Sequence, residues 1–162
     1  MPARVVGIDP GLVGTGFAVL ESGPGGIDVL GAGVIETRAS MPLSERVHAI
    51  YDGVFALLDK HAPSAVVVED LYASYDFPRT ALLMAHARGV ICLAAHQKGL
   101  PVVTLAPAEV KRAIAANGAA SKEQIQHSIQ RLLSLAELPR PSHVADALAM
   151  AFTGLGRMRL LR

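Results

Sequence analysis

The stretch VVGIDPGLVGTGFAVL, residues 5–20, decides the fold. It opens with the β-branched run Val5–Ile8, passes through a turn at Asp9-Pro10-Gly11, and resumes with a second candidate strand at Thr15–Leu20. Such runs, bounded by Pro and Gly, are typical of strands joined by a tight turn. The stretch therefore predicts two adjacent strands, with an acid, Asp9, at the end of the first.

The flanking sequence extends this pair into a larger sheet. A Gly/Pro turn at 23–26 and a third strand over 27–37 predict an antiparallel meander. Apolar runs predict strands at 65–68 and 101–105, and apolar residues at 3–4 spacing predict helices over about 42–61 and 79–98. Further helices are expected from Pro107, from Ser121 to about Leu135, and from Pro141. This order predicts an α/β fold with a mixed sheet, in one domain over residues 1–162.

The predicted helix over 79–98 is small or apolar around nearly its whole circumference. A helix of this kind must be covered on more than one side. Either the core or a second subunit could provide the cover.

Composition narrows the class of protein. Half of the residues are hydrophobic (51%) and 18% are charged, which is typical of a globular chain. No apolar run approaches the roughly 18 residues of a membrane helix, and the first residues do not form a signal peptide, so we expect no membrane partner. A single cysteine, Cys92, excludes a disulfide framework and favours the cytoplasm; we do not expect this thiol to be a nucleophile.

Charge is unevenly distributed along the chain. Residues 1–110 carry seven Lys/Arg against eleven Asp/Glu, whereas residues 111–162 carry eight against three. A basic C-terminal third behind an acidic front suits an enzyme that binds a polyanion. A solvated helix face explains the same count, and charge alone favours this simpler interpretation.

Three acids lie at positions that suggest chemistry. Asp9 and Glu69 directly follow apolar strands, and Asp146 lies in the last predicted helix. If the strands at 5–8 and 65–68 are neighbours, Asp9 and Glu69 lie side by side and repel each other unless a cation or a proton joins them. Carboxylate oxygens suit Mg²⁺ or Mn²⁺.

His143 precedes Asp146 by three residues, on the same helical face and near the helix start. Taken singly, these are an ordinary histidine and a surface acid. Taken with the strand-end acids, they predict phosphodiester hydrolysis with two metal ions. No Ser/His/Asp or Cys/His set is evident, so we expect no covalent intermediate.

Aromatic and basic residues extend this hypothesis to DNA. Three of the seven aromatic residues, Tyr72, Tyr75 and Phe77, lie in a short polar segment after Glu69. They could stack on unpaired bases or open a base step, or fold back as a small apolar cluster. Lys111 and Lys122 lie in the first turns of predicted helices and could bind phosphates, or be solvated surface charges.

Five motifs in order resemble the RuvC family of junction-resolving endonucleases over nearly the whole chain. They are GIDPG with TG (7–11 and 15–16), VE with an aromatic residue (68–69 and 72), ARGV (87–90), VK and SK (110–111 and 121–122), and ADALA (145–149).

The resemblance implies a ribonuclease H-like fold and a homodimer that nicks four-way (Holliday) junctions symmetrically, leaving 5′-phosphate and 3′-hydroxyl ends. It implies Mg²⁺ at Asp9, Glu69 and Asp146, where we expect two ions per site and Mn²⁺ as a substitute. We expect His143 to be a further metal ligand or a group that activates water. It also implies base stacking by Tyr72, phosphate contacts by Lys111 and Lys122, and partnership with the RuvA–RuvB branch-migration complex. The segment 72–86 matches loosely, so Tyr75 or Phe77 could replace Tyr72.

His143 departs from many members of the family, which have a carboxylate at this position. A neutral imidazole removes one negative charge and should favour Mn²⁺ over Mg²⁺.

Three alternatives stay open. Asp9, Gly11 and Thr15 also resemble the phosphate loop of actin-like ATP-binding proteins, although those need two such lobes. A YqgF-like RNA-processing nuclease shares the fold but does not account for the set of Tyr72, Lys111 and Lys122. A non-catalytic junction-binding module does not account for the intact acids.

Overall fold

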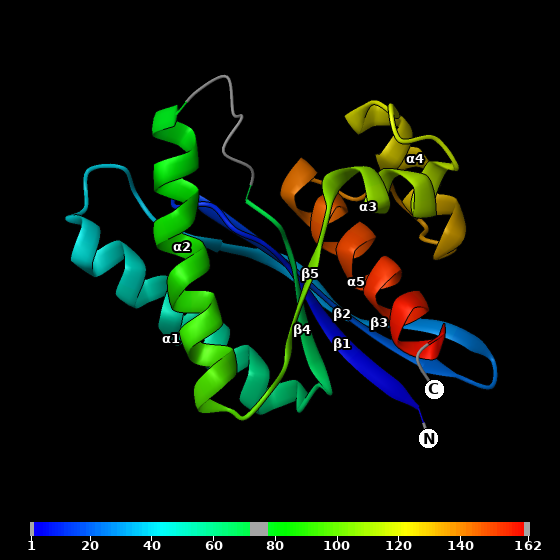
Figure 1. Ribbon diagram of the computed structural model, residues 1–162, viewed down its shortest axis with the longest axis horizontal. Coiled ribbons are helices and arrows are strands. Elements are labelled where there is room, and N and C mark those ends of the chain that lie inside the picture. Colours follow the sequence, from blue (N-terminus) through cyan, green and yellow to red (C-terminus); the bar gives the residue numbers. More distant parts are fainter. Residues whose placement is uncertain (1, 72–77, 161–162) are drawn as a thin grey trace.

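The computed structural model describes residues 2–71 and 78–160 as a five-stranded sheet with helices on both faces (Figure 1). The strands are β1 (Ala3–Asp9), β2 (Gly14–Gly23), β3 (Gly26–Glu36), β4 (Ala65–Glu69) and β5 (Val102–Leu105), in the order β3-β2-β1-β4-β5. β1, β2 and β3 are antiparallel, while β4 and β5 run parallel to β1. The predicted meander and mixed sheet are both confirmed.

Five helices complete the described fold: α1 (Leu43–His61), α2 (Pro78–Gln97), α3 (Pro107–Ala115), α4 (Lys122–Leu132) and α5 (Ser142–Leu160). The predicted capping box opens α4, because the Ser121 hydroxyl accepts a bond from the Gln124 N–H and the Gln124 side chain accepts one from the Ser121 N–H. α4 ends three residues before the predicted Leu135, and Ser134 beyond it takes up a left-handed conformation (φ 50°). None of the described helices is long and apolar enough to cross a membrane.

The sheet has a core on each face, and α1 and α2 cover the face opposite to α5 (Figure 1). Side chains alternate between the two faces along each strand. Val6 and Ile8 of β1 pack in the core with α1 and α2, whereas Val5 packs in the core with α5. β4 repeats this alternation, with Val67 in the α5 core. Because Val5 and Val67 face α5, the same alternation places Asp9 and Glu69, at the ends of β1 and β4, on the face that α5 covers.

α5 packs directly against the sheet at two glycines. A Cβ atom at Gly7 would lie 2.3 Å from the carbonyl oxygen of Ala147, and one at Gly16 would lie 2.2 Å from that of His143. Only glycine permits so close an approach of two backbones. The first turns of α5 are thereby held over the ends of β1 and β2.

Among the described residues, α2 is covered on one side only. Its buried residues are Ala87, Ile91, Ala94 and Ala95. On other sides Leu82 (66% exposed), Leu83 and Leu93 are open to solvent. The core therefore provides only part of the cover that the sequence predicts.

Candidate active site

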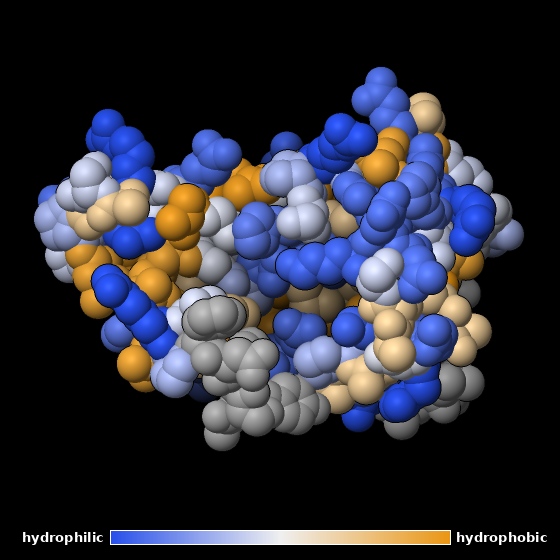
Figure 2. All heavy atoms as spheres, turned by 90° about the horizontal axis from the view of Figure 1, so that it is seen from above, coloured by the Kyte–Doolittle hydropathy of each residue, from blue (hydrophilic) through white to orange (hydrophobic). Residues whose placement is uncertain are grey.

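The ends of β1 and β4 and the start of α5 meet at one pocket of about 620 Å³. Its lining includes all four predicted ligand residues and both predicted lysines: Asp9, Glu69, Lys111, Lys122, His143 and Asp146. Figure 2 shows a hollow near the middle of one face of the molecule, with hydrophilic residues along much of its border. Side chains that are far apart in the sequence thus converge at one edge of the sheet.

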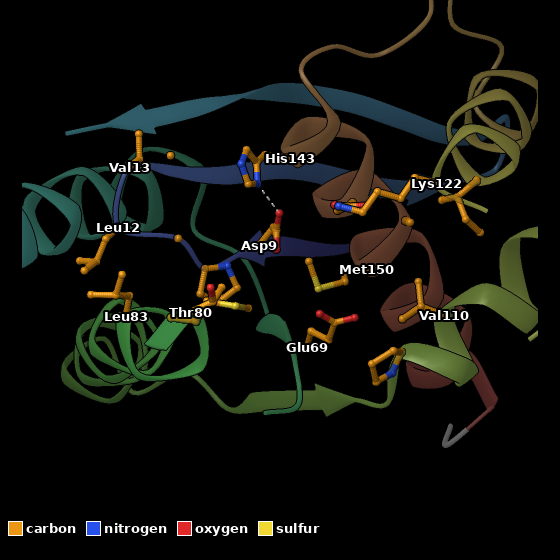
Figure 3. Close-up of a pocket in the computed structure, with 18 of the residues that line it drawn as sticks. Asp9, Leu12, Val13, Glu69, Thr80, Leu83, Val110, Lys122, His143 and Met150 are labelled. Atoms are coloured by element: carbon orange, nitrogen blue, oxygen red, sulfur yellow. Dashed lines mark hydrogen bonds and ion pairs between the residues drawn. The ribbon is translucent and has the colours of Figure 1, made fainter. Parts of the chain in front are cut away.

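Asp9 is the most buried acid of the site, with 8% of its surface exposed. Its Oδ2 lies 2.7 Å from Nδ1 of His143, which α5 holds above the end of β1 (Figure 3). This hydrogen bond raises the pKa of His143 above its ordinary value. Burial lowers the pKa, but the negative charges of Asp9 and Asp146 raise it further, so the net shift is upward. Asp9 and His143 form an ion pair whenever the imidazole is protonated.

The other two carboxyl groups are held in a site that penalises their charge. Burial raises the pKa of Glu69 to about 7, and repulsion from Asp9 and Asp146 adds to the rise. Burial and then the charge of Asp9 raise the pKa of Asp146 to about 6. Lys111 and Lys122 offset only part of these rises. The two lysines therefore do not fully offset the effects of burial and of carboxylate repulsion on these pKa values.

The side chains are not arranged as a finished metal cage. Among the described residues, no three His, Cys, Asp or Glu side chains are grouped so as to hold one metal ion. Asp9 is instead engaged with His143. To share a cation, these side chains would have to rotate, so their role as metal ligands stays a prediction.

Lys111 and Lys122 approach the acids from α3 and α4 respectively. In Figure 3, the Lys122 side chain extends from α4 toward the part of the pocket that holds Asp9. Within the described part of the chain, neither lysine forms an ion pair with an acid. Both ammonium groups are therefore available to an anionic ligand.

Other predicted residues lie elsewhere or outside the described residues. Tyr72, Tyr75 and Phe77 belong to the segment 72–77, which the structure does not describe. Cys92 lies half-buried on α2 and does not line the pocket.

The far wall of the pocket was missed by sequence reasoning. It includes Leu12, Val13, Leu83 and the buried Arg46. Arg46 could have been found, because it falls four residues before Ile50 on the buried stripe of α1, where a charged residue is unusual.

Comparison with known proteins shows a family match over most of the chain. Residues 5–154 match the sequence model of a family described as crossover junction endodeoxyribonuclease RuvC. Relatives of that name include one from Rhodopirellula baltica, 44% identical over 93% of this chain and 84% of its own length. Another, from Syntrophomonas wolfei, is 39% identical over 97% and 91% respectively.

Solved structures agree with this match. T. thermophilus RuvC in complex with a Holliday junction substrate superposes with a TM-score of 0.90 at 36% identity, over 98% of this chain and 96% of that one. The yeast mitochondrial Holliday junction resolvase Ydc2 superposes with a TM-score of 0.64 at 16% identity, which shows a shared fold alone. The predicted ribonuclease H-like fold is confirmed.

Proposed function

This chain belongs to the RuvC family of crossover junction endodeoxyribonucleases, and from that membership we propose that it resolves Holliday junctions by hydrolysing phosphodiester bonds at the crossover. The observation that carries the proposal is the convergence of Asp9, Glu69 and Asp146 in one pocket that Lys111 and Lys122 also line. A phosphate of the junction would enter this pocket. The match over most of the chain to a relative solved with a junction supports the same substrate.

The alternative functions are not favoured. The relatives from Rhodopirellula baltica and Syntrophomonas wolfei are named as crossover junction endonucleases rather than RNA-processing or ATP-binding proteins. The acids of the pocket are also intact, which a purely DNA-binding module would not need, because they repel phosphate.

We propose that Asp9, Glu69, Asp146 and His143 hold Mg²⁺, with Mn²⁺ as a substitute and two ions per site. The fit is chemical: burial and then the charge of Asp9 raise the pKa values of Glu69 and Asp146, and a divalent cation with oxygen ligands would relieve that repulsion. When bound, such ions would lower the pKa of a water molecule and stabilise the leaving 3′ oxygen.

The chain's own groups have separate tasks. Lys111 and Lys122 would bind the scissile phosphate and offset the charge that grows on it during attack. Asp9 accepts a hydrogen bond from Nδ1 of His143, which leaves Nε2 of a neutral imidazole as a proton acceptor. As the alternative to a metal-ligand role for His143, we infer that Nε2 can take the proton of the attacking water.

We also propose a homodimer in which α2 of one chain faces its copy. Leu82, Gly89 and Leu93 lie along one exposed stripe of this helix, and a Cβ at Gly89 would meet nothing within 4 Å. Burying this stripe would supply the second side of cover that the other described residues do not give α2. Leu93→Glu should shift the chain to monomers in sedimentation experiments, whereas Leu132→Glu on α4 should not.

A cytoplasmic location and partnership with RuvA–RuvB stay proposals from the single cysteine and the family resemblance. Adding RuvA–RuvB to a cleavage assay tests the second.

The decisive experiment compares a synthetic four-way junction with a linear duplex of the same sequence, with and without Mg²⁺ or Mn²⁺. We expect paired, ligatable nicks in the junction alone and only with a divalent ion. Asp9→Asn, purified identically, controls for a contaminating nuclease. Equal cutting of the duplex, or no cutting of the junction under any of these conditions, would contradict the proposal.

A further inference from the structure

Arg46 is a buried cation in the wall of the active-site pocket. It lies in the first turn of α1 with 9% of its surface exposed, on the same stripe as the fully buried Ile50 and Val54. It also lines the pocket that holds Asp9 and Glu69. A guanidinium in such a place needs a partner, because burying a charge without one is unfavourable.

The partners that the described residues provide for Arg46 are incomplete. Nε of Arg46 donates to Oγ1 of Thr37 at 3.0 Å, and the Thr37 hydroxyl donates in turn to the carbonyl oxygen of Leu12. Among the described residues, no carboxylate pairs with Arg46 and its two Nη nitrogens form no hydrogen bond. No fully buried side-chain nitrogen in the described part lacks a partner, so these nitrogens retain contact with the open space of the pocket.

We propose that Arg46 binds a phosphate of the cleaved strand that neighbours the scissile one. This inference rests on the proposed function, since it gives the strand a second contact in the same pocket. Thr37 fixes the Nε edge of the guanidinium, which leaves the Nη pair to donate to two phosphate oxygens. Leu12, to which Thr37 is bonded, follows Asp9 by three residues, so their Cα atoms are at most about 11 Å apart.

The wall around Arg46 favours a nucleotide over a free anion. Leu12, Val13 (61% exposed) and Leu83 lie on the side of the pocket away from Glu69 and Lys122 (Figure 3). Apolar surfaces of this kind suit the faces of a deoxyribose and a base. A strand would then contact Lys111 and Lys122 at one end of the pocket and Arg46 at the other.

If Arg46 had a purely structural role, its substitutions would act through the lost bond to Thr37 and not through the lost positive charge. Arg46→Met removes both the charge and that bond, whereas Arg46→Lys keeps the charge but lacks Nε. Thr37→Val removes the bonded hydroxyl and leaves the charge. Arg38→Met removes one exposed arginine that does not line the pocket.

The test is the affinity for a synthetic four-way junction, measured without divalent metal over a series of salt concentrations. Arg46→Met should weaken binding severalfold and flatten the log–log salt slope by about 0.7–0.9, as for one lost phosphate contact. Arg46→Lys should keep the wild-type slope. Thr37→Val should lower the melting temperature and keep the slope, and Arg38→Met should flatten it less than Arg46→Met.

A wild-type slope in Arg46→Met, or equal flattening in Arg46→Lys and Arg46→Met, would overturn the inference. If Arg46→Met does not fold, Arg46→Gln, whose amide can still donate to Thr37, replaces it in the comparison. If the wild-type chain binds and cuts junctions while these slopes are alike, only the role of Arg46 is lost. If the wild-type chain neither binds nor cuts junctions, the proposed function is lost with it.

Discussion

Nδ1 of His143 lies 2.7 Å from Oδ2 of Asp9, across 134 positions of sequence. The bond joins the first turn of α5 to the end of β1, so the carboxylate of Asp9 helps to hold the imidazole ring of His143 in place. It also raises the pKa of the imidazole, and the protonation state of His143 thereby depends on Asp9. The charge of this pair therefore changes with pH.

His143→Asp should shift the metal preference of cleavage from Mn²⁺ toward Mg²⁺, because it replaces a nitrogen ligand with a carboxylate. The ratio of cleavage rates in the two metals measures the shift. In the metal-free protein the variant should also lose the stability that the protonated imidazole provides. Since the folded pKa of His143 is raised, that contribution is present below about pH 6.5 and is lost as pH rises through the folded value. An unchanged metal ratio would identify His143 as a bystander.

Glu69→Gln should stabilise the metal-free protein at pH 8 while abolishing cleavage. The folded pKa of about 7 lies above the ordinary 4.5, so the charged form of Glu69 destabilises the fold above pH 7 and the penalty disappears below pH 4.5. We expect a gain of roughly 2 kcal/mol at pH 8 that fades toward pH 5, measured by chemical denaturation. Glu36→Gln, at an exposed acid, is the control. A gain that does not change with pH would contradict the assignment.

Asp146→Asn should reduce cleavage of a four-way junction by roughly a hundredfold or more, in line with the loss of a group that stabilises the transition state. Junction binding should stay the same or become tighter, because the change removes a charge that repels phosphate. Gel-shift and cleavage assays on one junction separate the two effects. Asp28→Asn, at an exposed position on β3, should alter neither. Wild-type cleavage by Asp146→Asn would remove this acid from the catalytic set.

Lys111→Ala should weaken junction binding and flatten its salt dependence by about one unit of log–log slope. The reason is that its ammonium has no acid partner within the described structure and faces the pocket. Lys60→Ala, at an exposed lysine in the last turn of α1, is the matched control. If both variants keep the wild-type slope and cleavage rate, Lys111 is a solvated surface charge.

Local sequence features were sufficient for most of the fold. β-branched runs placed β1 and β4, and the Ser121–Gln124 pair placed the start of α4. The adjacency of Asp9 and Glu69 followed once β1 and β4 were assumed to be neighbours, and the register of Ile8 opposite Val68 bears this out. The strands and the capping box are predictable because each depends on residues that are close in sequence, whereas the pairing of β1 with β4 had to be assumed.

Long-range features could not be predicted in the same way. The hydrogen bond between Asp9 and His143 and the place of Arg46 in the pocket wall depend on how α5 and α1 dock on the sheet. The cover of α2 is a second feature that the sequence predicted only in part. Its apolar circumference indicated that two sides need cover, but composition alone cannot say whether the second cover comes from the same chain.

The two glycines beneath α5 imply an unusual pattern of genetic sensitivity. Neither Gly7 nor Gly16 has a functional group, yet a single added methyl at either would meet the backbone of Ala147 or His143. The helix would be pushed outward, and Asp146 with it. Inactivating alleles should therefore arise at these two glycines as well as at the charged residues of the pocket. A survey that scored side-chain chemistry alone would overlook the glycine alleles.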